Sequence, residues 1–244
     1  MARFEGKRFL VTGGSGGIGR ATAELLASEG AEVVVTGTNE DKLQSVRDAI
    51  PGVKALKNDS SDPDAAKTLA EEAGQLDGIF LNAGYAVMVP HDEVSTDKFE
   101  EQFHVNVRGP MLQMSALSGQ LKDGGTIVVN TSIAQYAGME GNSLYGATKG
   151  ALHSYVRTLT KEMAKRKVRV NAVAPGPIST DFGSRAGMSK DEEKKFQEEI
   201  TKQVPLGRFG EAKEIATAVA FLLSDDASYV NGAELIVDGG MSGR

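Results

Sequence analysis

Tyr145 and Lys149 lie four residues apart in the stretch LYGATKG at residues 144–150, so on a helix they would share one face. A phenol with an ordinary pKa of about 10 holds its proton too tightly to act as a base near neutral pH. A nearby ammonium favours the phenolate and lowers that pKa, which suits an acid–base catalyst. The spacing therefore predicts a tyrosine that transfers protons, although such a pair alone is also typical of a solvated helix face.

Ser132 follows the β-branched run GTIVVN. A hydroxyl at the end of a strand can donate to a substrate oxygen and stabilise the charge that develops there. Taken alone, the same serine would be a turn or cap residue.

The elements that must position these side chains are short β-branched runs that alternate with segments of helical periodicity. Strand candidates cover 8–13, 32–37, 53–58, 78–84, 125–132, 168–176 and 233–240. Helix candidates cover 19–30, 40–50, 62–74, 96–119, 143–165 and 211–225. Several strands are apolar without alternation, as in sheets covered on both faces. The pattern predicts an α/β fold of the Rossmann type, a doubly wound parallel sheet of about seven strands with helices on both faces.

A glycine-rich turn, TGGSGGIG at residues 12–19, follows the first strand candidate. Its glycines leave room for a pyrophosphate at the backbone, and the free N–H groups of the following helix favour that anion. Glycine also serves tight turns that bind nothing. Here a strand precedes the turn and a helix follows it, which is the context of a nucleotide site.

The composition excludes several classes of function. The chain has 244 residues, of which 40% are apolar and 25% charged, and it contains no linker or repeat, so we predict one domain over 1–244. The net charge of −6 argues against a nucleic-acid surface. No apolar run is long enough for a membrane span or a signal peptide, and we expect a cytoplasmic protein. The absence of cysteine excludes disulfides, thiolate catalysis and cysteine-bound metal, and we predict no metal site.

The motifs together resemble the short-chain dehydrogenase/reductase family. The glycine turn has the spacing TGxxxGxG, and NAG at 82–84, the asparagine of HVNVRG, the serine of NTSI, the YxxxK pair, PG at 175–176 and VDGG at 237–240 follow in the family's order. The resemblance implies an NAD(P)(H)-dependent oxidoreductase that interconverts a small-molecule ketone and a secondary alcohol, with Tyr145 as general acid/base. It implies a catalytic tetrad of Asn106, Ser132, Tyr145 and Lys149, in which Asn106 holds a water and Lys149 also contacts the cofactor ribose.

The resemblance also implies a cofactor site, with a nucleotide-binding half over roughly 1–120 and a catalytic and substrate half over roughly 121–244. Asp59 would accept a hydrogen bond from adenine, and the backbone of Ile178 would hold the carboxamide beside Thr180. The expected cofactor residues are Gly13, Ser15, Gly16, Gly17, Ile18, Gly19, Thr38, Asn39, Asp59, Ser60, Asn82, Ala83, Gly84, Tyr145, Lys149, Pro175, Gly176, Ile178 and Thr180. Taken alone, Asp59 also suits a helix-cap region and PGPIST an ordinary loop.

The end of the second strand bears on the choice of cofactor. It carries Thr38 and Asn39 rather than the acidic residue that binds the ribose 2′-OH of NAD or the arginine that binds a 2′-phosphate. These two residues, with Lys42 nearby, could hold a 2′-phosphate, whereas Glu40 and Asp41 act against it. We predict NADP(H) as the preferred cofactor, with NAD(H) as the alternative.

Residues 179–204 break the strand–helix rhythm and match the family's substrate lid, where Phe182, Met188 and Phe196 are expected to face the ligand. The loops at 85–89 and 133–138 would complete the pocket. Their apolar residues indicate a small ketone or secondary alcohol as substrate. The pocket residues expected from these loops and their ends are Val87, Met88, Tyr136 and Met139.

Two other interpretations stay open. A reductase of 3-ketoacyl groups on acyl carrier protein would need a basic patch for its acidic partner, to which Arg166 and Lys167 could contribute. A non-catalytic nucleotide-binding scaffold would not need the tetrad. Relatives usually assemble through their two longest helices and the C-terminal segment, so we expect a homotetramer built on 96–118, 143–165 and the tail.

Overall fold

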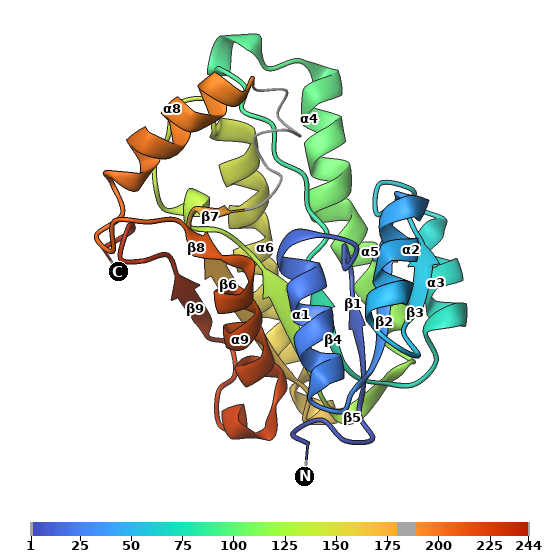
Figure 1. Cartoon of the computed structure of the whole chain (residues 1–244). Coiled ribbons are helices and arrows are strands. Elements are labelled where there is room, and N and C mark those ends of the chain that lie inside the picture. Colours follow the sequence, from blue (N-terminus) through green and yellow to red (C-terminus); the bar gives the residue numbers. More distant parts are fainter. Residues whose placement is uncertain (1, 180–188, 244) are drawn as a thin grey trace.

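A seven-stranded sheet forms the middle layer of the fold (Figure 1). The computed structural model describes residues 2–179 and 189–243. The strands lie in the order β3-β2-β1-β4-β5-β6-β9, and each neighbouring pair is parallel. Their bounds are β1 (Arg8–Val11), β2 (Glu32–Gly37), β3 (Lys54–Lys57), β4 (Leu76–Leu81), β5 (Leu121–Asn130), β6 (Arg169–Pro175) and β9 (Glu234–Val237). The predicted doubly wound parallel sheet is confirmed.

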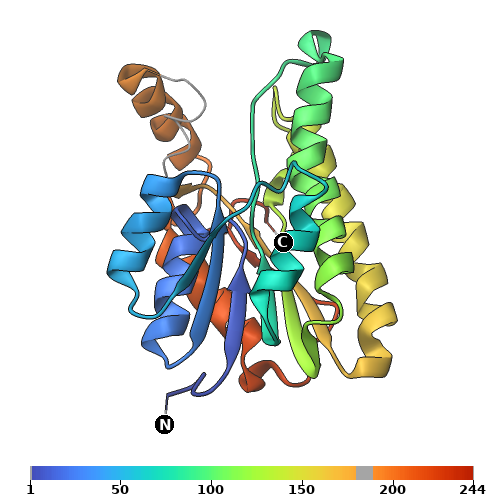
Figure 2. The ribbon, with the colours of Figure 1, turned by 90° about the vertical axis from the view of Figure 1, so that its right-hand side faces the viewer.

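Helices cover both faces of this sheet (Figure 2). One layer consists of α1 (Gly17–Ser28), α2 (Glu40–Ala49) and α9 (Ala212–Leu223), and the other of α3 (Ala65–Ala73), α5 (Gly109–Leu117) and α6 (Ser143–Glu162). Side chains alternate along β1, so Phe9 and Val11 belong to the first core and Leu10 to the second. Both faces are therefore buried, which explains the continuous apolar strands.

Several elements stand beyond the carboxyl ends of the strands. There, α4 (Thr96–Phe103) and α8 (Lys190–Thr201) rise on opposite sides of the sheet (Figure 2). A small second sheet, which the sequence did not predict, pairs β7 (Ile178–Ser179) with β8 (Gly210–Glu211).

The segment predicted as one helix over 96–119 is interrupted. A π-helical turn over His104–Arg108 separates α4 from α5. Pro110, in the first turn of α5, has no N–H to donate to the carbonyl of Asn106, and its ring would clash with that carbonyl in a regular α-helix. The widened turn avoids the clash, and it carries Asn106.

The strand order reverses between β1 and β4, because the chain first adds β2 and β3 on one side and then continues on the other. Doubly wound sheets bind ligands in the crevice at such a switch point, beyond the carboxyl ends of the strands. The glycine turn follows β1 and the NAG motif follows β4, so both sequence motifs lie at this crevice.

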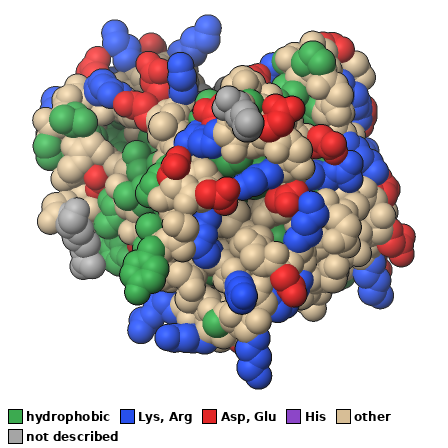
Figure 3. Space-filling view, turned by 90° about the horizontal axis from the view of Figure 1, so that it is seen from below, with side chains coloured by type: hydrophobic (Ala, Val, Ile, Leu, Met, Phe, Trp, Pro, Cys, Tyr) green, Lys and Arg blue, Asp and Glu red, His purple; other side chains and the backbone are tan. Residues whose placement is uncertain are grey.

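The opposite edge of the sheet, where the strands begin, carries interspersed charges of both signs (Figure 3). Four ion pairs there are Lys7–Asp225 at 2.8 Å, Arg8–Glu32 at 2.6 Å, Lys122–Asp77 at 3.0 Å and Arg166–Asp123 at 2.7 Å. Within residues 2–179 and 189–243, no helix is both long and apolar enough to cross a membrane. Over the same ranges, no cluster of three His, Asp or Glu side chains could hold a metal ion.

Candidate active site

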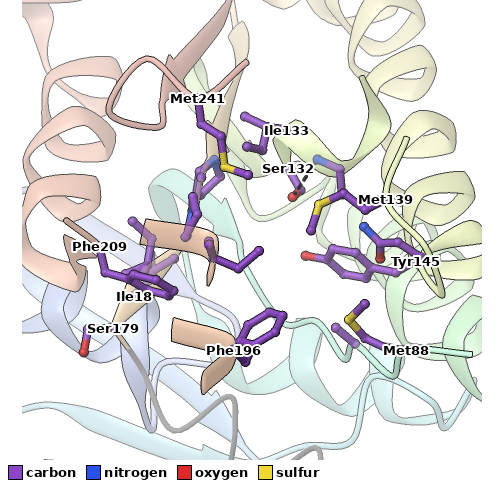
Figure 4. Close-up of a pocket in the computed structure, with 18 of the residues that line it drawn as sticks. Ile18, Met88, Ser132, Ile133, Met139, Tyr145, Ser179, Phe196, Phe209 and Met241 are labelled. Carbon is purple, nitrogen blue, oxygen red and sulfur yellow. Dashed lines mark hydrogen bonds between the residues drawn. The ribbon is translucent and has the colours of Figure 1, made fainter. Parts of the chain in front are cut away.

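Tyr145 and Ser132 face one cavity of about 250 Å³ beyond the carboxyl ends of β5 and β6 (Figure 4). Tyr145 lies in the first turn of α6, and Ser132 follows β5 at the start of a 3₁₀ turn over Ile133–Gln135. The helix packs closely on this turn, since a Cβ at Gly146 would lie 2.9 Å from the carbonyl oxygen of Ala134. This approach places the Ser132 hydroxyl beside the Tyr145 phenol, where it acts to lower the pKa of that phenol.

Lys149 lies one turn beyond Tyr145 and is 2% exposed. Its Nζ donates to the carbonyl of Asn130 at 2.8 Å and lies 5.5 Å from the centre of the Tyr145 ring. The ammonium is therefore beside the phenol, held by the end of β5.

The pKa values of this pair differ from the expectation drawn from their spacing. Burial raises the pKa of the Tyr145 phenol to about 12, and the neighbouring Ser132 hydroxyl, which acts to lower that pKa, only partly offsets this. Burial also lowers the pKa of Lys149 to about 8. The predicted lowering of the phenol pKa by Lys149 is thus wrong for this structure, because desolvation outweighs the neighbouring charge. At neutral pH the phenol is protonated.

Asn106 is completely buried, and its side chain connects the π-helical turn to the loop after β4 and to α6. Its Oδ1 accepts from the backbone N–H of Tyr85 at 2.7 Å, and its Nδ2 donates to the carbonyl of Tyr85 at 2.7 Å and to Thr148 Oγ1 at 3.1 Å. The π-helical turn thereby fixes the loop after β4 against α6. A Cβ at Gly84 would make only ordinary contacts, the nearest at 3.5 Å from Lys149 Nζ, so this approach does not depend on a glycine there.

A second, larger groove of about 690 Å³ runs along the switch point and meets the Tyr145 cavity. Ile18, Ala86, Asn130 and Tyr145 line both spaces. The structure brings the following predicted residues together in the groove: Gly13, Ser15, Gly16, Gly17, Ile18, Thr38, Asn39, Asp59, Ser60, Asn82, Ala83, Gly84, Tyr145 and Lys149.

The glycine turn suits the pyrophosphate of a dinucleotide. Gly13 and Gly17 have φ of 64° and 52°, which other residues rarely adopt. The first turn of α1 carries no acidic side chain, and Gly16 provides no side-chain cap, so the N–H groups at the start of the helix face the groove without a competing anion. Gly19, predicted to contact the cofactor, lies beneath the turn instead. A Cβ there would lie 2.4 Å from the carbonyl of Gly13, so its role is close packing.

Two polar residues that sequence reasoning missed join these motifs. Thr12 Oγ1 accepts from the backbone N–H groups of Asn82 at 2.9 Å and Ala83 at 3.0 Å. Asn130 Nδ2 donates to Asn82 Oδ1 at 3.0 Å, while its carbonyl holds Lys149. Thr12 begins the TGG stretch directly after β1, and Asn130 begins the NTSI stretch at the end of β5. Their position at the carboxyl ends of strands was the signal that could have identified them.

The far end of the groove holds the residues expected to contact the adenosine. The Asp59 carboxylate accepts from the N–H and the hydroxyl of Ser61, both at 2.8 Å. Asn39 caps α2, since its Oδ1 accepts from the N–H of Lys42 at 2.9 Å. Among the groove residues at the end of β2 and the start of α2, Lys42 is the cationic one.

Three predicted cofactor residues, Pro175, Gly176 and Ile178, line the cavity beside Ser132 and Tyr145 rather than the groove. Thr180, and the lid residues Phe182 and Met188, lie outside the described residues. Tyr136, expected in the pocket, is not among its described lining residues, and its hydroxyl donates to Glu234 instead.

The described part of the cavity is mainly apolar (Figure 4). Val87, Met88, Met139 and Phe196 line it as predicted. Its apolar lining residues are Ile18, Ala86, Val87, Met88, Ile133, Ala134, Met139, Pro175, Pro177, Ile178, Phe196, Ile200, Phe209 and Met241. Sequence reasoning missed Phe209 and Met241, because nothing local indicates that segments so far along the chain return to this site.

The basic residues considered for a carrier-protein surface do not meet at this cavity. Arg166 binds Asp123 at 2.7 Å and the carbonyl of Ser118 at 2.7 Å, close to the start of β5. Arg166 therefore lies at the opposite edge of the sheet from the cavity, and its guanidinium is already bound to neighbouring groups.

Comparison with known proteins agrees with this geometry. The family model described as enoyl-(acyl carrier protein) reductase matches residues 13–242. Glucose 1-dehydrogenase of Gluconobacter oxydans is 40% identical over 98% of this chain and 93% of its own. The 3-oxoacyl-[acyl-carrier-protein] reductase FabG of Escherichia coli is 40% identical over 98% of both chains. A short chain dehydrogenase from Burkholderia cenocepacia, solved in complex with NADP, has a TM-score of 0.89 and 32% identity over 98% of this chain and 99% of its own. The chain therefore belongs to the short-chain dehydrogenase/reductase family of oxidoreductases, as its motifs predicted.

Proposed function

We propose that this protein is an NADP(H)-dependent oxidoreductase that interconverts small, mainly apolar ketones and secondary alcohols, with Asn106, Ser132, Tyr145 and Lys149 as its tetrad. The observation that carries the proposal is that Ser132 and Tyr145 line the same mainly apolar cavity, which meets the glycine-turn groove at Tyr145. A scaffold that only bound a nucleotide would not need a reactive pair beside its groove.

In the proposed reaction, the groove residues would hold a nicotinamide cofactor, which would provide the hydride chemistry when bound. Tyr145, protonated at neutral pH with a pKa of about 12, donates its proton to the carbonyl oxygen during reduction. The Ser132 hydroxyl donates a second hydrogen bond to the same oxygen and stabilises its charge. Lys149 provides a positive charge beside the phenol, and Asn106 keeps the loop after β4 in place.

Replacing Tyr145 with phenylalanine tests this assignment. The Tyr145→Phe variant retains the ring but lacks the proton, so we expect the rate of ketone reduction to fall by about 100- to 10,000-fold. Tyr155→Phe is the matched control on the same helix, since Tyr155 packs against the core away from the cavity. The measurement is NADPH oxidation with a panel of ketones. An unchanged rate in Tyr145→Phe would remove Tyr145 from the mechanism.

The groove favours NADP(H), since the residues after β2 that line it include Thr38, Asn39 and Lys42 and no carboxylate. The NADP complex of the Burkholderia cenocepacia relative supports the same choice. We expect kcat/KM with NADPH to exceed that with NADH by about tenfold or more, which corresponds to about 1.4 kcal/mol. Thr38→Asp should reverse this preference through repulsion of the 2′-phosphate, whereas Thr217→Asp, an exposed substitution on α9, should not. A wild-type preference for NADH would contradict the proposal.

A second candidate is reduction of 3-ketoacyl groups on acyl carrier protein, which the Escherichia coli relative's name supports. Including 3-ketoacyl thioesters in the ketone panel separates the two: activity on thioesters alone would establish the second candidate. Oxidation of glucose, suggested by the Gluconobacter relative's name, suits the site less well, because apolar side chains predominate among the described lining residues and few polar ones, such as Asn142 and Gln197, are present for the many hydroxyls of a sugar.

We also propose a homotetramer. Phe99 on α4 and Met111 and Leu112 on α5 expose between 37% and 44% of their surface. These two helices cover the 96–118 segment through which the subunits are expected to assemble.

A further inference from the structure

Glu234 on β9 has a buried carboxylate that no step of the proposed reaction uses. Its side chain is only 8% exposed. One carboxylate oxygen accepts from the Thr131 hydroxyl at 2.6 Å and the Gln135 amide at 2.8 Å, and His153 Nδ1 lies 3.2 Å from it. The other oxygen accepts from the Tyr136 hydroxyl. Burial raises the pKa of the Glu234 carboxyl, but these hydrogen bonds outweigh burial and leave that pKa below its ordinary value.

Three of the four partners belong to one loop. Thr131 immediately precedes Ser132, and Gln135 and Tyr136 end the 3₁₀ turn that Ser132 begins. A buried carboxylate is costly unless donors surround it, so the ionised group holds these donors in place. Because the loop is fixed on both sides of Ser132, the hydroxyl between them has little freedom.

The fourth partner connects this loop to the catalytic helix. His153 lies eight residues beyond Tyr145 on α6, so with Lys149 the three residues share one face of the helix. Glu234 therefore stands where β9, the Ser132 loop and α6 meet. For Ser132 and Tyr145 to face the same cavity, the loop and the helix must keep their relative position.

We propose that Glu234 is a positioning residue: its carboxylate anchors the 131–136 loop to β9 and α6, and thereby places the Ser132 hydroxyl against Tyr145 and the substrate oxygen. The catalytic part of this inference rests on the proposed function, in which Ser132 contacts the substrate. The anchoring part concerns the protein alone.

Glu234→Gln tests the anchoring part, because glutamine has nearly the same shape without the charge. The backbone N–H groups of 134–137 are hydrogen-bonded within the turn, so hydrogen exchange measures its opening. We expect exchange in 131–137 to accelerate at least about tenfold, while exchange in β1 and β2 stays unchanged. Glu32→Gln on β2, which alters an exposed carboxylate bound to Arg8, is the matched control and should leave the 131–137 loop as it is. An unaltered loop in Glu234→Gln, or equal acceleration in every segment, would overturn the proposal.

Steady-state kinetics and cofactor titration test the catalytic part. For Glu234→Gln we expect kcat for ketone reduction to fall at least about tenfold, with the dissociation constant of NADPH unchanged, since neither Glu234 nor its four partners are among the residues that line the groove. Glu234→Asp, which keeps the charge on a shorter side chain, should recover part of that loss. Wild-type kcat in Glu234→Gln would overturn the catalytic part. A wild-type chain that reduces no ketone would instead contradict the proposed function, and the exchange measurement would still decide whether Glu234 anchors the loop.

Discussion

At the scale of single residues, burial determines the chemistry of the site more than charge spacing does. Tyr145 and Lys149 are neighbours, yet desolvation moves both pKa values toward the neutral forms. A phenol that is protonated at neutral pH is ready to donate in reduction, whereas alcohol oxidation needs it to accept a proton. The lysine stays largely charged below its pKa of about 8.

Lys149 should reduce the stability of the fold at neutral pH. Its pKa falls from 10.5 to about 8 on folding, so burying the ammonium costs about 3 kcal/mol. Lys149→Met removes that cost and loses the bond to Asn130, for a net gain on the order of 1 to 2 kcal/mol in the free energy of unfolding at pH 7.

The sign follows from proton uptake. Between pH 8 and 10.5 the unfolded chain binds more protons at this residue than the folded chain, so wild-type stability rises with pH there. The advantage of Lys149→Met should therefore be full below pH 8 and shrink above it. Urea unfolding at pH 7 and at alkaline pH measures this, with the exposed Lys161→Met on the same helix as the control. A gain that did not depend on pH would contradict the assignment.

At the scale of elements, the site depends on close approaches that only small residues permit. Gly19 lets α1 lie against the glycine turn, and Gly146 lets α6 lie against the Ser132 loop. The π-helical turn before Pro110 aims Asn106 at the loop after β4. The sequence marks the glycines and the proline, but which backbone each one meets comes from the packing of separate elements.

Two helical glycines should therefore respond in opposite ways to alanine. In Gly19→Ala the new methyl group meets the carbonyl of Gly13, so the turn must shift, and we expect NADPH affinity to fall at least about tenfold with a loss of stability. Gly150→Ala on α6 meets nothing within 4 Å and should raise stability by about 0.5 to 1 kcal/mol. Fluorescence titration with NADPH and thermal unfolding give both results. Equal changes in NADPH affinity and in stability for the two variants would refute the inference that Gly19 packs beneath the turn.

At the scale of the whole molecule, six of the exposed apolar side chains fall into two groups on the surface. Phe99, Met111 and Leu112 follow α4 and α5, while Phe221, Tyr229 and Leu235 lie near the β9 edge of the sheet. Exposed apolar surface of this kind is typical of assembling proteins. The charged edge in Figure 3, where both signs are mixed, is a poor surface for a polyanion.

The proposed homotetramer predicts a mass about four times the 25.7 kDa of one chain in light scattering after size exclusion. Met111→Glu should reduce that mass, because a carboxylate buried at an interface is costly. Ser45→Glu on α2, in the other helical layer, should not. A wild-type monomer would contradict the proposal.

The sequence by itself determined the sheet and the glycine turn, because periodicity and turn residues are local properties. The tetrad candidates came from the resemblance of its ordered motifs to a known family. The strand candidates correspond to the seven strands, and their predicted ends at 84 and 132 extend into the loops that line the site. Only the tertiary structure decided the direction of the pKa shifts, the place of Gly19 beneath the turn, the interruption at 104–108 and the separation of Arg166 from the cavity. Each of these depends on burial or on contacts between segments far apart in the chain. Glu234 is the clearest case: its residue type is unremarkable in the sequence, and its partners lie about 80 to 100 residues earlier.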